Sequence, residues 1–328
     1  MTAIRFGIRG TGSWAPDKRL TNADLSAMVD TSDEWIVQRT GIKERRILPP
    51  ELTTSDMCVQ AAQRALDDAG LAATDIDLIV LGTVTPDQQV PATSCKVAQR
   101  LGCESTPAFD LAAGCSGFVY ASSVAAQFLR AGTYRNVLVI GAEALSRITN
   151  YNDRTSCILF GDAAGAVVYS TDFEYGELLS SSMQADGNGY DVMYQRAGGA
   201  QRPLSAERLA AAEHKLVIHG REVYRFAVSR MVELVKGEQA NNPGLTLGAV
   251  VPHQVNLRIL ESAREKLGLA SDRLYTNIDR YGNTSAASVP VALDEARRGG
   301  FFHDLDGQLV VMCAFGAGLT WGSVALKW

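Results

Sequence analysis

Cys115 lies in the segment Asp110-Leu-Ala-Ala-Gly-Cys-Ser-Gly-Phe, where the pattern predicts the end of a buried strand over 107–112 and the start of a helix over 116–130. Backbone N–H groups at a helix start lack intrahelical partners and the dipole is positive there, so we expect a lowered thiol pKa. The same N–H groups can hold the oxyanion that forms when a thiolate attacks a carbonyl. The alternative for Cys115 is a buried structural cysteine.

Two more polar residues follow predicted strands. His253 directly follows the apolar run 247–252, and Asn283 lies in Gly-Asn-Thr-Ser-Ala-Ala-Ser before a predicted helix. In a sheet with helices on both faces, side chains at the carboxyl ends of strands share one edge, so Cys115, His253 and Asn283 can meet there. Taken singly, His253 could be a core histidine and Asn283 a turn residue.

The elements that would hold these residues alternate between buried strands and amphipathic helices. Apolar runs without alternation indicate strands covered on both faces, which is typical of an α/β fold with helices on both sides of the sheet. The predicted strands cover 4–8, 78–84, 107–112, 136–141, 161–170, 247–252, 275–278, 309–314 and 319–327. The main predicted helices cover 54–70, 93–101, 116–130, 256–267 and 286–298.

Three segments are less regular. Gly10-Thr-Gly-Ser-Trp-Ala15 matches the dinucleotide pattern G-x-G-x-x-G/A, but Pro16 and Asp17 follow where that motif needs a helix, so we predict a loop without a nucleotide site. The high content of Gly, Ser and Asp in residues 171–207 predicts a connection with hairpins. The pattern of residues 209–239 predicts a long helix, in which Gly220 could introduce a break.

The chain reads as two similar halves, 1–172 and 173–328. Phe160-Gly-Asp-Ala-Ala-Gly-Ala-Val-Val-Tyr resembles Phe315-Gly-Ala-Gly-Leu-Thr-Trp-Gly-Ser-Val, and each is a Gly-rich turn that feeds the last strand of its half. This similarity indicates an internal duplication. Cys115 would lie in the first half, and His253 with Asn283 in the second.

Composition excludes several classes of function. The 328 residues carry a net charge of −5 and a pI near 5.5, which gives no basic field for nucleic acid. No apolar run approaches roughly 18 residues and no leader pattern opens the chain, so we expect no membrane span and a cytoplasmic location. Six scattered cysteines indicate free thiols in a reducing compartment, and no His, Cys or Asp cluster has metal-ligand spacing.

Five blocks together resemble β-ketoacyl-[acyl-carrier-protein] synthase III, in that family's order and over essentially the whole chain. Three are the segments around Cys115, around Val-Pro-His253-Gln-Val-Asn-Leu-Arg-Ile, and around Gly-Asn283-Thr-Ser-Ala-Ala-Ser-Val-Pro. The others are Asp30-Thr-Ser-Asp-Glu-Trp-Ile with Arg39-Thr-Gly-Ile, and Ala314-Phe-Gly-Ala-Gly-Leu-Thr-Trp-Gly-Ser.

The resemblance implies a thiolase-like fold, in which two duplicated halves form a layered α-β-α-β-α sandwich, usually as a homodimer. It also implies a reaction: Cys115 takes an acyl group from acyl-CoA as a thioester, which then condenses with malonyl-[acyl-carrier protein] with loss of CO₂. The product would be 3-oxoacyl-[acyl-carrier protein], the first condensation of dissociated fatty-acid synthesis. CoA and carrier-protein thioesters are substrates, so no cofactor is expected.

The resemblance also assigns roles to single residues. His253 and Asn283 would be donors to the enolate left by decarboxylation, and backbone N–H groups of Cys115 and Ala317 would form the oxyanion hole. Ala317 stands where the family often has Gly, a change that keeps the N–H. The implied CoA-binding residues are Trp35, Arg39, Arg154 and Asn256, with Trp35 and Arg154 around the adenine. The implied carrier-protein patch is Arg225, Arg258 and Lys266.

Alternatives to these binding roles are ordinary ones: Trp35 as a helix-face core residue, and the three cations as solvated charges. Val90 stands where many family members have Phe, which caps the acyl pocket across the dimer interface. The smaller side chain would admit a longer or branched starter.

Three other functions remain open at this point. One is a starter-unit condensing enzyme or acyltransferase of a polyketide or other secondary pathway. Another is a Cys-His-Asn thioester hydrolase, although the segment around Cys115 lacks the C-G-S-C-W pattern of papain-like proteases. The third is a non-catalytic binding homologue, which the intact Cys-His-Asn set disfavours.

Overall fold

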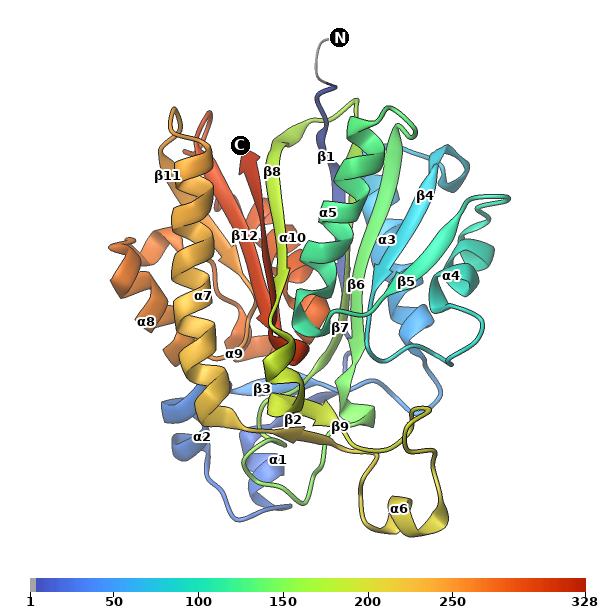
Figure 1. The fold of residues 1–328 in the computed structure, drawn as a ribbon, viewed down its shortest axis with the longest axis vertical. Helices are drawn as coiled ribbons and strands as arrows, with labels where there is room; N and C mark the ends of the chain where they lie inside the picture. The colour runs from blue at the N-terminus through green and yellow to red at the C-terminus, as the bar shows by residue number, and fades with distance from the viewer. Residues whose placement is uncertain (1–3) are drawn as a thin grey trace.

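The protein, a computed structural model that describes residues 4–328, is built on one mixed sheet of nine strands (Figure 1). No helix among the described residues is long and apolar enough to cross a membrane. The strands, in their order across the sheet, are β11 (Leu247–Pro252), β12 (Leu309–Gly316), β13 (Thr320–Lys327), β8 (Tyr175–Ala185), β1 (Gly7–Trp14), β7 (Asp162–Ser170), β6 (Asn136–Ala144), β4 (Leu78–Gly82) and β5 (Ala108–Leu111).

Strand order repeats between the two halves of the chain. From the edge inward, the strands of the first half lie in the order β5, β4, β6, β7, β1. Counted along the chain, these are its third, second, fourth, fifth and first strands. The strands of the second half lie in the matching order β11, β12, β13, β8 from the opposite edge. The place of a third strand, beside β11, is taken by a single parallel bridge between Leu274 and Val250. The repeat supports the division at residue 172, which stays a prediction because the sheet runs on through the β1–β8 pair.

Alternate side chains of each central strand enter different cores. On β6, Val137 and Val139 face one core and Leu138 and Ile140 face another, as period-two geometry requires. The first core also takes apolar residues of β11 and β12, so it lies between the two halves. Its helices are α5 (Gly117–Arg130) and α10 (Ser288–Arg298).

The other faces of the strands are covered by separate helices (Figure 1). α3 (Thr54–Ala69) and α4 (Thr93–Leu101) cover the first half, whereas α7 (Gly220–Asn241) and α8 (Leu257–Leu267) cover the second. Helix, strand and helix layers therefore alternate, with α5 and α10 in the middle. The predicted layered α/β fold is confirmed.

The predicted loop at Gly10–Ala15 is wrong, because β1 runs through these glycines to Trp14. A Cβ on Gly12 would lie 2.4 Å from the carbonyl oxygen of Ala61 on α3, so the glycines let the helix backbone approach the strand. The segment is a strand where a dinucleotide motif needs a helix start, which agrees with discounting a nucleotide site.

The region 171–239 also differs from the prediction. The connection contains β8, an eleven-residue strand at the centre of the sheet, which the Ser-rich sequence concealed. The predicted helix over 209–239 begins at Gly220, since α6 (Ala206–Ala210) and β10 (Leu216–Ile218) precede it. β10 pairs with β9 (Met193–Gln195) in a small separate sheet.

The remaining short elements lie at the same end of the molecule as the carboxyl ends of β4, β6 and β11 (Figure 1). These elements are β2 (Arg19–Thr21), α1 (Asn22–Ser26), α2 (Asp33–Thr40), β3 (Glu44–Arg46) and α9 (Ile278–Tyr281). The strand expected at 275–278 is absent from the structure, and α9 begins at Ile278.

We expect Gly12→Ala to destabilise the protein by about 2–3 kcal/mol, because the added methyl meets the α3 backbone, which cannot move aside. Gly237→Ala is the control: Gly237 lies in α7 with nothing within 4 Å of its missing Cβ, so alanine raises stability by about 0.5–1 kcal/mol. Urea unfolding midpoints of the two variants measure both changes. Equal midpoints would contradict the close packing of β1 on α3.

Candidate active site

Cys115 lies where the first half of the chain meets the second. It is in the middle of the short 3₁₀ helix η2 (Gly114–Ser116), directly before α5, and is 6% exposed. A Cβ on Gly316 would lie 2.4 Å from the Cys115 nitrogen, so the end of β12 touches the nucleophile's backbone. On the other side, the Asp110 carboxylate accepts hydrogen bonds from the N–H groups of Thr93 and Ser94, which fixes β5 to the start of α4.

The expectation of a lowered thiol pKa is wrong for this structure. The pKa of Cys115 is raised to about 12, mainly by burial; the Ser285 hydroxyl opposes this rise and the nearby Glu143 carboxylate adds to it. The sequence places Cys115 at a helix start, but only the fold shows how little water reaches it. The resting protein therefore holds a thiol, and its proton must leave as the sulfur attacks.

His253 follows β11, and its backbone N–H donates to Cys313 O at 2.8 Å. Its Nδ1 lies 2.7 Å from the Ser288 hydroxyl, which also accepts from the N–H of Gln254 at 3.2 Å. Ser288 can therefore donate its own proton to Nδ1, and that donation would leave the imidazole proton on Nε2. Nε2 has no hydrogen-bond partner within residues 4–328.

Burial lowers the pKa of His253 to about 3. The imidazole is therefore neutral at physiological pH and offers one N–H donor at Nε2. A neutral donor can stabilise a developing oxyanion without carrying a buried charge in the resting state.

Asn283 is held by its backbone and its side-chain oxygen. Its N–H donates to Leu159 O at 2.8 Å, and its carbonyl accepts from Gly161 at 3.0 Å. Its Oδ1 accepts the N–H of Ser285 at 2.9 Å. With Oδ1 occupied, the two amide hydrogens are what Asn283 can offer to a ligand.

Cys115, His253 and Asn283 line one narrow cavity of about 20 Å³, so the structure brings the three residues together as the sequence predicted. The other walls are Val192 and Met193, apolar side chains of α7, β12 and the loop after β11, and the turn at 316–319. Such walls exclude water and strengthen each hydrogen bond made inside.

A second cavity of about 160 Å³ opens on another side of Cys115. It is lined mainly by apolar side chains, with Ser285 and Gln195 among the polar ones. The apolar members include Leu145, Ile148, Phe160, Met193 and Leu216. Its size fits a short apolar chain attached to the sulfur.

Comparison with known proteins agrees with this geometry. A family model for 3-oxoacyl-[acyl-carrier-protein] synthase III matches residues 109–187, and one for its C-terminal part matches residues 239–328. The beta-ketoacyl-[acyl-carrier-protein] synthase III of Caldanaerobacter subterraneus subsp. tengcongensis is 50% identical over 329 residues, covering 99% of this chain and 98% of the relative. The chain belongs to the β-ketoacyl-[acyl-carrier-protein] synthase III family. It is therefore an acyltransferase.

Solved structures of the family are similar over the whole chain. The 3-oxoacyl-[acyl-carrier-protein] synthase III of Aquifex aeolicus is 41% identical with a TM-score of 0.88, covering 98% of this chain and all of that one. The priming β-ketosynthase of the R1128 polyketide pathway is 34% identical with a TM-score of 0.89, covering 99% and 96%. Synthases of different pathways thus share this architecture.

The predicted oxyanion residue Ala317 begins the 3₁₀ helix η7 (Ala317–Leu319) and lines both cavities beside Cys115. Its nitrogen lies 2.9 Å from where a Cβ on Gly114 would stand, so the η2 and η7 turns are in contact. This position is compatible with the family role of a backbone donor, which stays a prediction.

The predicted CoA residues gather around α2. The guanidinium carbons of Arg39 and Arg154 lie 4.5 and 4.8 Å from the centre of the half-buried Trp35 ring. Arg154 also pairs with Asp30 at 3.0 Å. Asn256 caps α8 and donates to Arg39 O at 3.0 Å, which ties α8 to α2.

The predicted carrier-protein patch is exposed on two adjoining helices. Arg225 is on α7, and Arg258 and Lys266 are on α8. The helices are joined by the Tyr224–Ser262 hydroxyl pair at 2.9 Å. Within the described chain, none of the three cations is in an ion pair. Val90 is 83% exposed and lines neither cavity beside Cys115 within this single chain.

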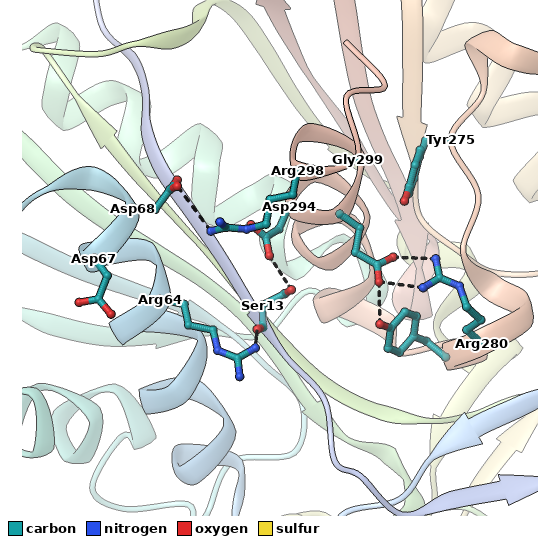
Figure 2. A pocket seen from close by; sticks show the side chains of 11 residues that line it. Ser13, Arg64, Asp67, Asp68, Tyr275, Arg280, Asp294, Arg298 and Gly299 are labelled. Atoms are coloured by element: carbon teal, nitrogen blue, oxygen red, sulfur yellow. Dashed lines mark hydrogen bonds and ion pairs between the residues drawn. The ribbon is translucent and has the colours of Figure 1, made fainter. Parts of the chain in front are cut away.

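A larger groove of about 850 Å³ lies elsewhere, between β1, α3 and α10 (Figure 2). Most of its charged side chains are paired with each other: Arg298 with Asp294 and Asp68, and Arg280 with Glu295. Ser13 on β1 accepts from Arg64 through its carbonyl and donates to Asp294 through its hydroxyl. These interactions hold α3 and α10 to each other and to β1, and leave little chemistry for a ligand. Within residues 4–328, no group of three or more His, Cys, Asp or Glu could hold a metal ion.

Sequence reasoning missed Ser288, Ser285 and Glu143. Ser288 stands five residues after Asn283, inside a block that was recognised for the asparagine alone. Glu143, at the end of β6, is fully buried among hydroxyl groups, and no local pattern marks it.

We expect His253→Gln to make the protein less sensitive to acid. The pKa of His253 is about 3 when folded and 6.5 when unfolded, so the stability from a neutral His253 is complete above pH 6.5 and declines as pH falls toward 3. Between pH 6 and 4, the unfolding free energy of the wild type should therefore fall faster than that of His253→Gln, by on the order of 1 kcal/mol per pH unit.

Urea unfolding at several pH values measures this slope, and exposed His303→Gln is the control, which keeps the wild-type slope. Parallel curves for His253→Gln and the wild type would show that His253 is not held neutral by burial.

Proposed function

We propose that the chain condenses an acyl-CoA starter with malonyl-[acyl-carrier protein] to give 3-oxoacyl-[acyl-carrier protein], through a thioester on Cys115. The observation that carries the proposal is the position of Cys115 between two cavities. One is also lined by the proposed donors His253 and Asn283, and the other is lined mainly by apolar side chains and is large enough for a short acyl chain.

In the first half-reaction, the Cys115 sulfur attacks the acyl-CoA carbonyl and CoA leaves as a thiolate. Cysteine suits this step because its thioester stays reactive toward carbon. The backbone N–H groups of Cys115 and Ala317 would hold the tetrahedral oxyanion. Stacking on Trp35 and the charges of Arg39 and Arg154 would bind the adenosine end of CoA, and Arg154 must leave the ring when the adenine enters between them.

In the second half-reaction, malonyl thioester loses CO₂ and leaves an enolate. His253 Nε2 and the Asn283 amide would donate to the enolate oxygen, while its carbon attacks the acyl-Cys115 carbonyl. Cys115 leaves as a thiolate and the 3-oxoacyl product stays on the carrier protein. No step needs a cofactor, since both substrates carry their own activated thioester.

Exposed residues support the two proposed partners, the carrier protein and a second copy of this chain. Arg225, Arg258 and Lys266 form the proposed dock for the acidic carrier protein, close to the cavity that Val223 and Phe226 of α7 line. A homodimer would cover β5, the edge strand of the sheet, together with the exposed Val90. The buried free thiols of the chain agree with a reducing, cytoplasmic location.

A second candidate keeps the chemistry and changes the pathway: a priming condensing enzyme for polyketides. The 34% identity to the R1128 priming ketosynthase favours keeping it. A thioester hydrolase is disfavoured because the other walls of the donor cavity are apolar. Apart from Cys115, His253 and Asn283, no side chain that lines this cavity could orient an attacking water.

The test is intact-protein mass after incubation with acyl-CoAs of graded length, then again after adding malonyl-[acyl-carrier protein]. We expect an acyl adduct that Cys115→Ala abolishes and that malonyl-[acyl-carrier protein] discharges to a 3-oxoacyl product. Asn283→Ala should retain the adduct and lose discharge by about 10²–10³-fold, the effect of one missing oxyanion donor.

Two outcomes would redirect the assignment. An adduct that persists with the malonyl donor indicates an acyltransferase. Loss of the adduct to water without product indicates a hydrolase. The chain length that reacts fastest identifies the starter.

We expect Val90→Phe to shift the preference toward shorter acyl chains. A partner subunit's residue 90 would reach the acyl cavity, and the added ring would shorten it. Relative acylation rates for the acyl-CoA series measure the shift. Ile4→Phe, another exposed apolar position, is the control. An unchanged chain-length profile would contradict the role of Val90.

A further inference from the structure

Glu143 is a buried carboxyl group that the proposed reaction does not use. It is the second-last residue of β6 and is fully buried. The Thr85 hydroxyl donates to its Oε2 at 2.7 Å, and the Val84 N–H lies 3.2 Å from both oxygens. The Ser285 hydroxyl donates to Oε1 at 3.2 Å. No arginine or lysine within residues 4–328 pairs with it, which is unusual for a buried acid.

Ser285 connects this carboxyl group to the nucleophile. It lines the acyl cavity together with Cys115, and its hydroxyl opposes the rise in the thiol pKa. Its backbone has a φ of 49°, which a residue with a side chain rarely adopts. The N–H bond to Asn283 Oδ1 holds it in this strained conformation. The fold thus fixes a hydroxyl that donates to the Glu143 carboxyl group and lines the same cavity as Cys115.

We propose that Ser285 and Glu143 form a proton store behind the nucleophile: Glu143 takes the thiol proton of Cys115 through the Ser285 hydroxyl on acylation and returns it on condensation. The return of the proton during condensation rests on the proposed function. Loss of the thiol proton, in contrast, can be measured in the free protein.

In the acylation step, the Cys115 S–H proton passes to Ser285 Oγ while the Ser285 O–H proton passes to the Glu143 carboxylate. The sulfur forms a C–S bond to the acyl carbon, and the C–S bond to CoA breaks. CoA leaves as a thiolate, which takes a proton from solvent. The acyl-enzyme therefore carries one proton on Glu143 that the free enzyme carried on sulfur.

The condensation step needs that proton. Loss of CO₂ converts malonyl thioester to an enolate, whose carbon forms a bond to the acyl carbon as the C–S bond to Cys115 breaks. The Cys115 thiolate takes the Ser285 proton, and Ser285 recovers one from Glu143. One proton per turnover enters from solvent, at CoA, which balances the loss of CO₂ from a malonyl carboxylate.

The surroundings of Glu143 suit this role. Burial raises its pKa to about 7, so the carboxyl group can hold either state at neutral pH. The other titratable groups that face this region are Cys115 on η2 and Cys58 on α3, whose pKa the carboxylates of Asp87 and Asp110 also raise. Those two carboxylates accept backbone N–H groups instead of the Ser285 hydroxyl.

His253 does not replace Glu143 as the acceptor. Its arrangement with Ser288 gives Nε2 a proton to donate, and its pKa of about 3 makes it a weak base. A division of labour follows, in which His253 donates to the enolate and Glu143 receives from the thiol.

A purely electrostatic or structural Glu143 would behave in the opposite sense. The negative carboxylate raises the pKa of the Cys115 thiol, so its removal alone would give more thiolate and faster alkylation. A proton acceptor predicts slower alkylation when it is removed. The direction of the change therefore distinguishes the two roles.

The test measures the rate of Cys115 alkylation by iodoacetamide from pH 5.5 to 9, located by peptide mass so that the exposed Cys95 does not interfere. We expect the wild-type rate to rise through an inflection near pH 7 as Glu143 ionises. Glu143→Gln should lose this inflection and react about 100-fold more slowly at pH 8, within the range of general base catalysis. Ser285→Ala, which interrupts the path, should show the same loss.

Glu238→Gln is the matched control. Glu238 is also a buried glutamate, 1% exposed, and accepts from the Ser180 and Ser323 hydroxyls, but it lies on α7 and contacts neither Cys115 nor Ser285. It should keep the wild-type rate and pH profile.

Three results would overturn the proposal: Glu143→Gln alkylated at the wild-type rate or faster, an unchanged inflection in that variant, or wild-type reactivity in Ser285→Ala. If Glu143→Gln does not fold, Ser285→Ala alone decides. Failure of the proposed function shows separately, as the absence of an acyl adduct from any acyl-CoA in the wild type.

Discussion

The active site depends on the close approach of two helix starts at the centre of the molecule. Missing side chains make this approach possible: a Cβ on Gly141 would lie 2.2 Å from the Ala286 carbonyl, and one on Gly82 would lie 2.5 Å from the Gly117 backbone. η2 with α5 and η6 (Ser285–Ala287) with α10 therefore pack directly on the strands and on each other. Cys115 belongs to the first of these turns, and Asn283 stands two residues before the second. Any larger residue at these glycines would push Cys115 away from Asn283.

This packing also excludes water, and that sets the protonation states. Burial raises the pKa of the Cys115 thiol to about 12 and lowers that of the His253 imidazole to about 3, so both are neutral at rest. A thiolate–imidazolium pair, the usual activated form of a Cys-His site, is therefore disfavoured before substrate binds. If Cys115 is the nucleophile, as proposed, its thiol must lose the proton in the reaction itself, and the buried carboxyl group of Glu143 is the proposed acceptor.

The sequence predicted the strands that are buried on both faces, because β4, β11 and β12 are apolar at every position and need no partner to be recognised. It failed for β8, whose Ser180–Ser182 side chains meet other polar groups such as Ser323 and Glu238 inside the fold. It failed at Gly10 and Gly12 because a strand in contact with a helix backbone needs glycine for the same steric reason as a turn does. That Cys115, His253 and Asn283 lie together was predictable from the segments around them, whereas the thiol pKa and the Glu143 contact depend on distant segments that only folding brings together.

The repeated strand order explains why the two sides of Cys115 carry different chemistry. Thr85 follows the second strand of the first half, and His253 follows the second strand of the other; Glu143 and Phe315 are each the second-last residue of a fourth strand. Each pair meets across its own half: the Thr85 hydroxyl binds Glu143 at 2.7 Å, and the His253 ring lies edge-on to Phe315 at 5.7 Å. One scaffold position thus holds a carboxyl group in the first half and an apolar ring in the second. Burial keeps His253 neutral, whereas the hydrogen bonds from hydroxyl groups favour the ionised form of Glu143, so equivalent positions of the two halves differ in protonation chemistry.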